Sequence, residues 1–217
     1  MKDSWMQTFI KELELYANHA TCADIYVSAL VIDETYPTAL SKGYNGTPRG
    51  IIHCEELNDL IVRFAERYNP SQIAGFIDSE GVLNEKGVKE TSEFIGRYKD
   101  NHAAIVAGRQ LLSLSRMDDD TLKSLTGNKL TRLNANIIHY RWEIHAEANA
   151  LGKIGYLDLN DKRYSIMINW SPCFECAKNI IARGLKRVYY RNEFVDPRWD
   201  DSSVEFMKLS GVDIIKF

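Results

Sequence analysis

Residues 143–184 read "EIHAEANALGKIGYLDLNDKRYSIMINWSPCFECAKNIIARG", and this stretch decides the fold. Its middle, residues 163–170, is rich in β-branched and aromatic residues, which favours a strand. Residues 145–154 and 173–184 read as helices, and Gly184 is a typical helix stop. A helix, a strand and a second helix in this order are typical of an α/β sheet with helices packed on it.

The same alternation of strands and helices continues on both sides of this stretch. The sequence predicts an amphipathic helix at about 4–20, strands at 24–33 and 36–40, a loop over "SKGYNGTPRG" (41–50), a strand at 185–190, a helix at 200–211 and a last strand at 212–217. Alternating strands and helices favour a mostly parallel sheet covered on both faces. Between about 55 and 138 the sequence favours helix instead. We therefore expect one domain over 1–217 with a mostly helical insertion at about 55–138.

Composition excludes several classes of protein. The chain has 217 residues, 45% of them hydrophobic, and a formal net charge of −3 from 27 basic and 30 acidic residues. This weakly acidic balance gives no electrostatic footprint for nucleic acid, and no segment is apolar enough for a membrane helix. The first residues carry Asp and Glu where a signal peptide would be basic and then apolar. We expect a cytoplasmic protein whose four cysteines are reduced thiols or metal ligands.

Four residues of the opening stretch carry its chemistry. Cys173 and Cys176 lie three apart at the start of a helix, so both can bind one metal ion, and the helix dipole favours their thiolates. His145 supplies an imidazole from a different helix. Two thiolates and one His leave a tetrahedral zinc with an open position, which is typical of a catalytic site. Glu147 is close enough to act on a water in that position, because zinc lowers the pKa of such a water to about 7.

Each part of this pattern alone is weak evidence. A single C-x-x-C is also found in redox proteins and in structural zinc sites, and H-x-E often occurs by chance. The joint pattern of H-A-E, residues 148–171, and P-C-x-x-C is the signature of zinc-dependent nucleobase deaminases. A structural zinc site or a redox site would leave Glu147 without a role.

The loop and the cysteine segment narrow the family. "SKGYNGTPRGIIHC" (41–54) resembles the G-Y-N-G-x-P-x-G loop of deoxycytidylate (dCMP) deaminases, and "SPCFECAKNIIARGLKRVYY" (171–190) resembles that family's segment around its cysteine pair. The resemblance covers about 21–54 and 139–217. It implies a three-layer α/β/α cytidine deaminase-like fold with a central mixed five-stranded sheet. It also implies hydrolysis of dCMP to dUMP by a zinc enzyme.

The resemblance assigns further residues by their place in the motifs. The position of Asn45 contacts the sugar–base end of the nucleotide, although a turn residue with positive φ is the alternative for an Asn in "YNG". Ala146 touches the pyrimidine through its backbone, and Ser171 and Pro172 form part of the base pocket. Glu147 passes a proton from water to the ring nitrogen and then to the leaving ammonia.

A second zinc is also implied by the resemblance. Some phage dCMP deaminases hold a structural zinc with two cysteines, a His and a Glu, and "TCADI", "IHCEE" and "IIHYRWEIHAE" match those positions. The predicted ligands are Cys22, Cys54, His139 and Glu143, with His53 as a substitute. The alternative is two buried thiols and a surface His–Glu pair.

The chain departs from the family where triphosphate regulators would bind. It has "ADIYVS" (23–28) where many members are basic, and only Lys153 in the helix after H-A-E. These departures put regulation by dCTP and dTTP in doubt. Arg49, Lys178 and Arg191 lie near the motifs, but each is equally well a surface charge, so the 5′-phosphate contact stays unassigned.

Three other functions remain open at this point. The substrate could be a modified deoxycytidylate or a base in single-stranded nucleic acid, although the acidic balance argues against a strand. A non-catalytic zinc scaffold fits least, because it would not need Glu147. As partners we expect the nucleotide substrate, no stable nucleic acid, no membrane, and further copies of this chain in a homo-oligomer such as the family's hexamer.

Overall fold

The structure is a computed structural model, and it describes residues 1–22, 25–49, 53, 67–69, 71–72, 75–76, 78, 84–87, 89–90, 143–195 and 202–217. The chain divides into two compact units. The first comprises Met1–Ala20, Ile25–Gly46 and Ile144–Phe217, and the second comprises Thr21–Asp24 and Thr47–Glu143. Among the described helices, none has the length and apolar character that a membrane crossing requires.

The first unit is built on one mixed sheet of five strands. In chain order these are β1 (Ser28–Asp33), β2 (Thr38–Tyr44), β3 (Tyr164–Trp170), β4 (Arg187–Asn192) and β5 (Asp213–Lys216). Their order across the sheet is β2-β1-β3-β4-β5. β1 pairs antiparallel with both β2 and β3, whereas β3, β4 and β5 run parallel. The predicted mixed five-stranded sheet is therefore confirmed.

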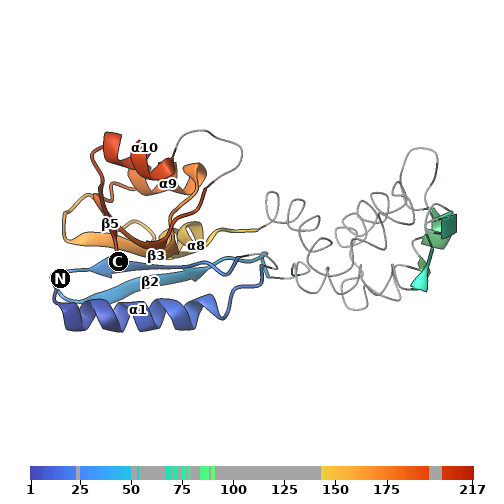
Figure 1. Ribbon diagram of the computed structural model, residues 1–217, viewed down its shortest axis with the longest axis horizontal. Coiled ribbons are helices and arrows are strands. Elements are labelled where there is room, and N and C mark those ends of the chain that lie inside the picture. The colour runs from blue at the N-terminus through green and yellow to red at the C-terminus, as the bar shows by residue number, and fades with distance from the viewer. Residues whose placement is uncertain are drawn as a thin grey trace. The chain divides into compact units, whose positions relative to one another are not determined.

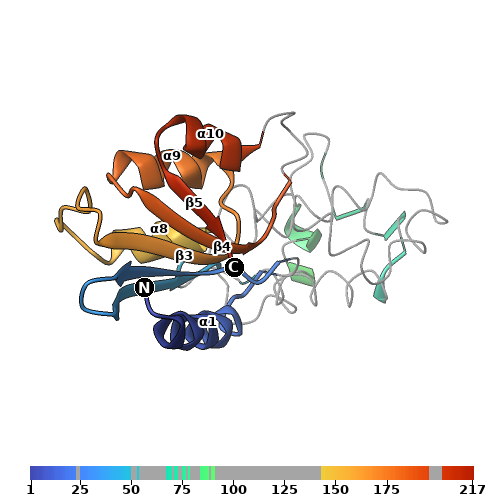
Figure 2. The same cartoon turned by 60° about the vertical axis from the view of Figure 1, so that its left-hand side comes forward.

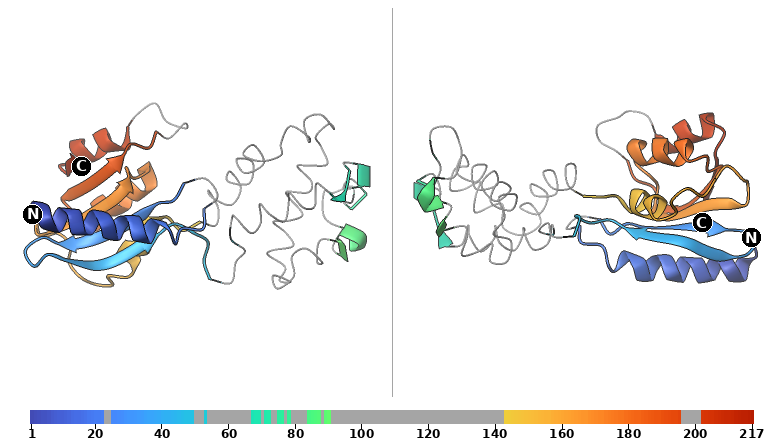
Figure 3. Two further views of the ribbon diagram at one scale, coloured as in Figure 1. Left: turned by 60° about the horizontal axis from the view of Figure 1, so that its bottom comes forward. Right: turned by 180° about the vertical axis from the view of Figure 1, so that it is seen from behind.

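Helices cover both faces of this sheet, as Figures 1 and 2 show. α1 (Asp3–Ala17) lies alone on one face among the described helices, and the views of Figure 3 show it running along β1 and β2. α8 (Ala146–Gly152), α9 (Phe174–Ala182) and α10 (Ser203–Leu209) cover the other face. The three-layer α/β/α arrangement follows.

The core explains why β1 can lie inside this arrangement. All six residues of β1 are buried, because alternate side chains face different helices. Leu30 and Ile32 pack with α1, whereas Ala29 and Val31 pack with the helices opposite. The run of small and apolar residues from Ser28 to Ile32 is therefore what this position in the sheet requires.

One predicted loop is partly wrong. The sequence predicts a loop from Ser41, but β2 continues through Tyr44. Ser41 and Gly43 alternate with exposed or half-buried residues and face α8, and at Gly43 there is no room for a Cβ atom. Serine and glycine are residue types that often mark loops, but here they lie in a strand and allow it to pack closely against a helix.

The second unit is described only in short pieces. The ring of Tyr68 packs edge-on against Phe76, with centroids 5.1 Å apart, and Phe76 is 2% exposed. The Tyr68 hydroxyl also bonds the carboxylate of Glu90, and the side chain of Asn84 donates to the carbonyl of Gly75. Most of the predicted helical insertion at about 55–138 lies outside the described residues, so its extent and the single-domain organisation stay predictions.

Candidate metal centre

Three potential ligands converge where two helices of the first unit begin. His145 is the N-cap residue of α8, and Cys173 is the N-cap residue of α9. Nδ1 of His145 lies 3.5 Å from Sγ of Cys173 and 3.3 Å from Sγ of Cys176. All three donor atoms lie within 4.8 Å of one another. Among the described residues, this is the only such group of His, Cys, Asp or Glu.

The spacing of these atoms fits a zinc ion. Zn–N distances of about 2.0 Å and Zn–S distances of about 2.3 Å at a tetrahedral angle place nitrogen and sulfur about 3.5 Å apart. The two observed N–S distances are close to this value. One imidazole and two thiols are also the donor types that zinc prefers, and three protein ligands leave one position open.

Local hydrogen bonds hold the segment that carries the cysteines. After β3 ends, the amide of Ser171 donates to the carbonyl of Asn192 at 2.7 Å, and the Ser171 hydroxyl accepts from the amide of Phe194 at 2.8 Å. The carbonyl of Pro172 accepts from the hydroxyl of Ser203 at 2.5 Å. These contacts fix the chain immediately before Cys173. Gly184, with φ of +86°, follows the end of α9, as the sequence predicted for a helix stop.

The two thiols differ in their affinity for protons. Hydrogen bonding with Cys176, and to a smaller extent with His145, lowers the pKa of the Cys173 thiol to about 4, although its burial opposes this shift. The pKa of Cys176 is raised, because its thiol is hydrogen-bonded to Cys173 and because it is buried. A thiolate is therefore favoured at Cys173, at the N-terminus of α9. A bound divalent cation would favour the thiolate form of both residues.

Glu147 lies in the first turn of α8 and is 3% exposed. Burial raises the pKa of its carboxyl, and the neighbouring Cys173 raises it further, while His145 opposes them. A carboxyl group that binds a proton more readily than an exposed Glu is suited to moving a proton at neutral pH. The sequence predicted this residue beside the metal ligands, and the structure places it there.

Asn45 has a structural role that the sequence did not reveal. It is 1% exposed, its Oδ1 accepts from the amide of Val27 at 2.8 Å, and its Nδ2 donates to the carbonyl of Ile25 at 2.8 Å. No non-glycine residue in the described parts of the chain has a positive φ, so the turn alternative for Asn45 is wrong. Its contact with a nucleotide stays a prediction.

The other predicted base-pocket residues lie next to the metal ligands. Ala146, fully buried, is the first residue of α8 and stands between His145 and Glu147. Ser171 is 3% exposed, and Ser171 and Pro172 lead directly into Cys173. Their contribution to a base pocket and their contacts with a base stay predictions.

Two of the candidate phosphate-binding cations, Lys178 and Arg191, form ion pairs with other side chains of the protein. Lys178 pairs with Glu175 at 2.7 Å on the exposed surface of α9. Arg191 pairs with Glu14 of α1 at 2.9 Å, so its side chain lies on the face of the sheet opposite α8 and α9. These two ion pairs favour the surface-charge interpretation for both residues.

The predicted second zinc site cannot be followed through the described residues. Cys22 is fully buried and Glu143 is partly buried, and both belong to the second unit. Cys54 and His139 lie outside the described residues. Nδ1 of His53, the substitute ligand, lies 2.9 Å from the hydroxyl of Thr47. The second site therefore stays a prediction.

Two residues that support the site were missed from the sequence. Asn169 accepts from the amide of Ser28 and donates to the carbonyl of Tyr26, both at 2.8 Å. Ser203 bonds the carbonyl of Pro172 from the start of α10. Each acts on a segment about 30 or more positions away in the chain, and no local pattern of residues marks such a contact.

A His–Cys–Cys set at helix N-termini beside a buried glutamate, carried by an α/β/α fold, is typical of zinc-dependent deaminases. The sequence profile described as "Cytidine and deoxycytidylate deaminase zinc-binding region" matches residues 3–192. The chain belongs to this family, as its motifs predicted.

Known proteins extend the comparison of fold. A crystal structure of dCMP deaminase from the cyanophage S-TIM5 in apo form is similar over 100% of both chains, with 19% identity and a TM-score of 0.51. The same enzyme in complex with dCMP and dUMP is 20% identical, with a TM-score of 0.52 over 100% of this chain and 99% of the other. These likenesses confirm the predicted fold.

A further relative is a longer protein than this chain. ComE operon protein 2 of Bacillus subtilis (strain 168) is 22% identical over 191 residues, which are 88% of this chain. The chain spans 61% of the length of that relative.

Proposed function

We propose that this protein is a zinc-dependent hydrolase that deaminates dCMP to dUMP. The observation that carries the proposal is the buried carboxyl of Glu147 beside the His145, Cys173 and Cys176 donor set. Membership of a cytidine and deoxycytidylate deaminase family supports the reaction class. The similar cyanophage enzyme is described with dCMP and dUMP, which supports the choice of substrate.

Each residue has a defined task in this reaction. His145, Cys173 and Cys176 would hold zinc, and a bound zinc lowers the pKa of a water molecule by several units. Glu147 would take a proton from the attacking water and deliver it to the ring nitrogen of cytosine, and would then move the remaining proton of the added hydroxyl to the departing amine. The oxygen of that water bonds to the ring carbon that carries the exocyclic amine, the C–N bond to the amine breaks, and ammonia leaves, so one water is consumed in each turnover.

The burial of Glu147 suits it to this task, because the reaction moves protons at a place that is largely shielded from bulk solvent. At 3% exposure the carboxyl is shielded from bulk solvent, which favours transfer of its proton to the substrate. Its raised pKa reduces the cost of holding that proton between the two transfers.

The first test compares the wild type with Glu147→Gln. The variant keeps the shape of the side chain but cannot carry the proton, so we expect kcat for dCMP to fall about a hundredfold to ten-thousandfold. Zinc content should be unchanged, because Glu147 is not one of the three ligands. Glu175→Gln is the matched control, since Glu175 is an exposed residue of α9 paired with Lys178. Wild-type protein that binds zinc and turns over no dCMP would contradict the proposal.

Other substrates are distinguished by the same assay. If the base pocket differs from that of dCMP deaminases, we expect the protein to deaminate a modified deoxycytidylate or a cytosine in single-stranded nucleic acid instead of dCMP. Zinc binding without turnover of any of these would favour the non-catalytic scaffold. The acidic composition favours the free nucleotide over a strand.

The finer points of the proposal concern metal count and assembly. We propose a second, structural zinc bound by Cys22, Cys54, His139 and Glu143, supported by the match of these residue types to the phage family pattern. We also propose that the protein is cytoplasmic, supported by its four cysteines, which we expect to be reduced thiols or metal ligands. We propose that it is a homo-oligomer, supported by the family resemblance.

A further inference from the structure

β2 and α8 approach each other closely at Gly43. A Cβ atom built on Gly43 would lie 2.1 Å from the carbonyl oxygen of Ala146 and 2.5 Å from the amide nitrogen of Ala150. It would also lie 3.0 Å from Cβ of Asn149. The two nearest atoms belong to the backbone of α8, so no side-chain rotation relieves the contact. Ordinary contact between non-bonded heavy atoms requires a separation larger by about 1 Å or more.

Gly43 is required for space and not for its backbone conformation. The described glycines with positive φ are Gly155, Gly184 and Gly211, so Gly43 adopts angles that other residues also adopt. An alanine at Gly43 would therefore change one thing, the distance between β2 and α8.

Hydrogen bonds on both sides of Gly43 fasten the helix to the strand. The hydroxyl of Ser41 donates to the carbonyl of Ala150 at 2.7 Å. Nδ2 of Asn149 donates to the carbonyl of Tyr44 at 2.8 Å, and Nζ of Lys153 donates to the carbonyl of Lys42 at 2.8 Å. These bonds run along the helix, so α8 is held at a fixed height and a fixed register on β2.

The backbone atom that a Cβ on Gly43 would meet first belongs to the residue between two site residues. Ala146, whose carbonyl meets Gly43, is preceded by His145 and followed by Glu147. A displacement of about 1 Å at Ala146 is large for groups that must meet a metal ion and a substrate. We propose that Gly43 is a positioning residue, whose missing side chain sets His145 and Glu147 at the distance from Cys173 and Cys176 that the reaction needs. This inference rests on the proposed function of that site.

The test compares Gly43→Ala with a matched control on the same helix. Gly152→Ala adds the same methyl group at the last residue of α8, where nothing lies within 4 Å. Both variants and the wild type are loaded with zinc for dCMP kinetics, and with cobalt for absorption spectra. Cobalt(II) reports ligand distances and angles through its d–d and thiolate bands. Thermal unfolding of each metal-loaded protein shows whether it is folded.

We expect Gly43→Ala to lower kcat about a hundredfold, with a smaller change in KM, and to shift or weaken the cobalt bands. Gly152→Ala should match the wild type in both measurements. A Gly43→Ala protein that is folded, has wild-type cobalt bands and keeps kcat within about threefold would overturn the proposal.

A second variant covers the case in which Gly43→Ala does not fold. Ser41→Ala removes the hydrogen bond to Ala150 without adding an atom, so α8 is loosened and not pushed. We expect kcat to fall by up to about tenfold, with a measurable change in the cobalt bands. Unchanged kcat and unchanged bands in this variant would overturn the proposal.

The cobalt spectrum separates this inference from the proposed function. If the wild type does not deaminate dCMP, the proposed substrate is wrong, but the spectra of Gly43→Ala and Gly152→Ala still report the position of His145. A changed spectrum in Gly43→Ala alone then supports the positioning role for whatever substrate the site accepts.

Discussion

Two asparagine side chains form hydrogen bonds with the backbone of the segment that leads into β1. Asn45 bonds the carbonyl of Ile25 and the amide of Val27, and Asn169 bonds the carbonyl of Tyr26 and the amide of Ser28. A carboxamide suits this task because it offers one donor and one acceptor, as a backbone residue of a neighbouring strand does. The backbone of residues 25–28 is thereby hydrogen-bonded on both edges where the chain enters β1.

Asn45→Ala should therefore destabilise the fold and not only weaken substrate binding. The substitution leaves the amide of Val27 and the carbonyl of Ile25 without their partner, and each such loss costs about 1–3 kcal/mol when the group is buried. Because the two bonds are only partly buried, we expect the free energy of unfolding to fall by about 2 kcal/mol in urea titrations. Asn179→Ala, at an exposed position of α9, is the control and should change stability little. Unchanged stability of Asn45→Ala would assign Asn45 to the substrate alone.

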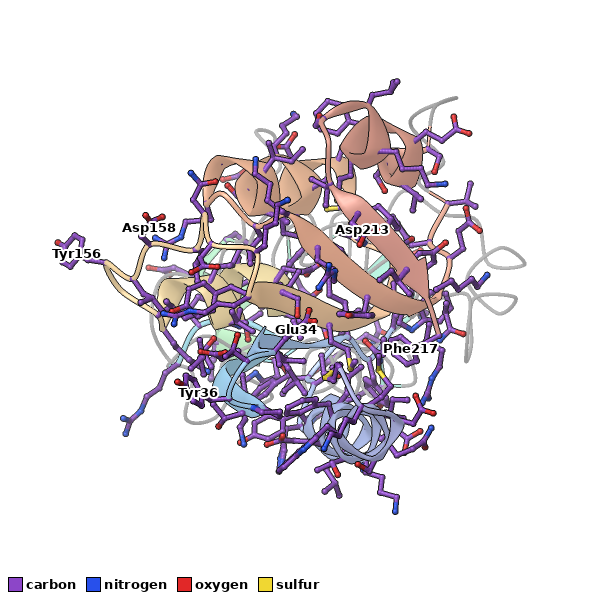
Figure 4. The ribbon with its side chains drawn as sticks, turned by 90° about the vertical axis from the view of Figure 1, so that its left-hand side faces the viewer. Glu34, Tyr36, Tyr156, Asp158, Asp213 and Phe217 are labelled. Atoms are coloured by element: carbon purple, nitrogen blue, oxygen red, sulfur yellow. The ribbon has the colours of Figure 1, made fainter. Side chains whose placement is uncertain are left out.

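At the scale of elements, an ion-pair network joins the ends of three strands. Glu34 follows β1, and its carboxylate accepts from Arg187 of β4 at 2.9 Å and from the hydroxyl of Tyr189 at 3.3 Å. Arg187 also pairs with Asp213 of β5 at 3.1 Å. Figure 4 shows Glu34 and Asp213 at the end of the sheet that faces the viewer. The network links strands that are not neighbours in the sheet, since β3 lies between β1 and β4.

The network makes stability depend on alkaline pH through Tyr189. Burial and the adjacent Glu34 carboxylate raise the pKa of Tyr189 to about 12, from about 10 in an unfolded chain. Between these values the folded state keeps the phenol proton and the unfolded state loses it, so stability decreases as pH rises. The decrease that Tyr189 contributes by pH 12 is about 2 kcal/mol.

Tyr189→Phe should remove this part of the pH dependence. The variant keeps the ring in the core but has no proton to lose, so its free energy of unfolding should fall less steeply than that of the wild type between pH 10 and 12. Denaturant titrations at several pH values measure the slope. Tyr36→Phe is the control, because Tyr36 is 71% exposed and its substitution should leave the slope unchanged. Equal slopes for Tyr189→Phe and the wild type would contradict the assignment.

The elements also show how far the sequence predicts this structure. β3 and α9 were predictable because the apolar pattern, the cysteine pair and Gly184 all act within a few residues of one another. The end of β2 was not predictable, because Ser41 and Gly43 pack against α8, which lies about 100 positions later in the chain. The convergence of His145, Cys173 and Cys176 was predictable from residue type and spacing. The contacts of Asn45, Asn169 and Ser203 were not, since each depends on a chain segment that only the fold brings near.

At the scale of the whole chain, topology explains why the candidate metal centre lies where it does. β3 and β4 are parallel, and the chain leaves β3 at Trp170 beside Asn192, the end of β4. Ligand sites in α/β sheets commonly lie at the carboxyl ends of parallel strands, where loops lead into helix N-termini. Cys173 follows β3 by three positions and begins α9, and α8 brings His145 to the same place from its own N-terminus.

The two compact units give the metal content a direct interpretation. His145, Cys173 and Cys176 belong to the first unit, whereas Cys22 and Glu143 of the predicted second site belong to the second. Because the two ligand sets share no residue, each site should lose its metal independently. We expect about two zinc ions per chain in the wild type, measured by atomic emission after purification without chelator.

Single substitutions should then divide this content. Cys176→Ala removes a ligand of the first site, and Cys54→Ala removes a predicted ligand of the second, so each variant should hold about one zinc ion. Only Cys176→Ala should abolish turnover outright, since a metal-binding site needs its full ligand set to activate water. Cys54→Ala should instead lower the melting temperature, because the binding energy of a structural zinc is folding energy. One zinc per wild-type chain, unchanged in Cys54→Ala, would leave the first site as the only zinc site and make Cys22 and Cys54 ordinary thiols.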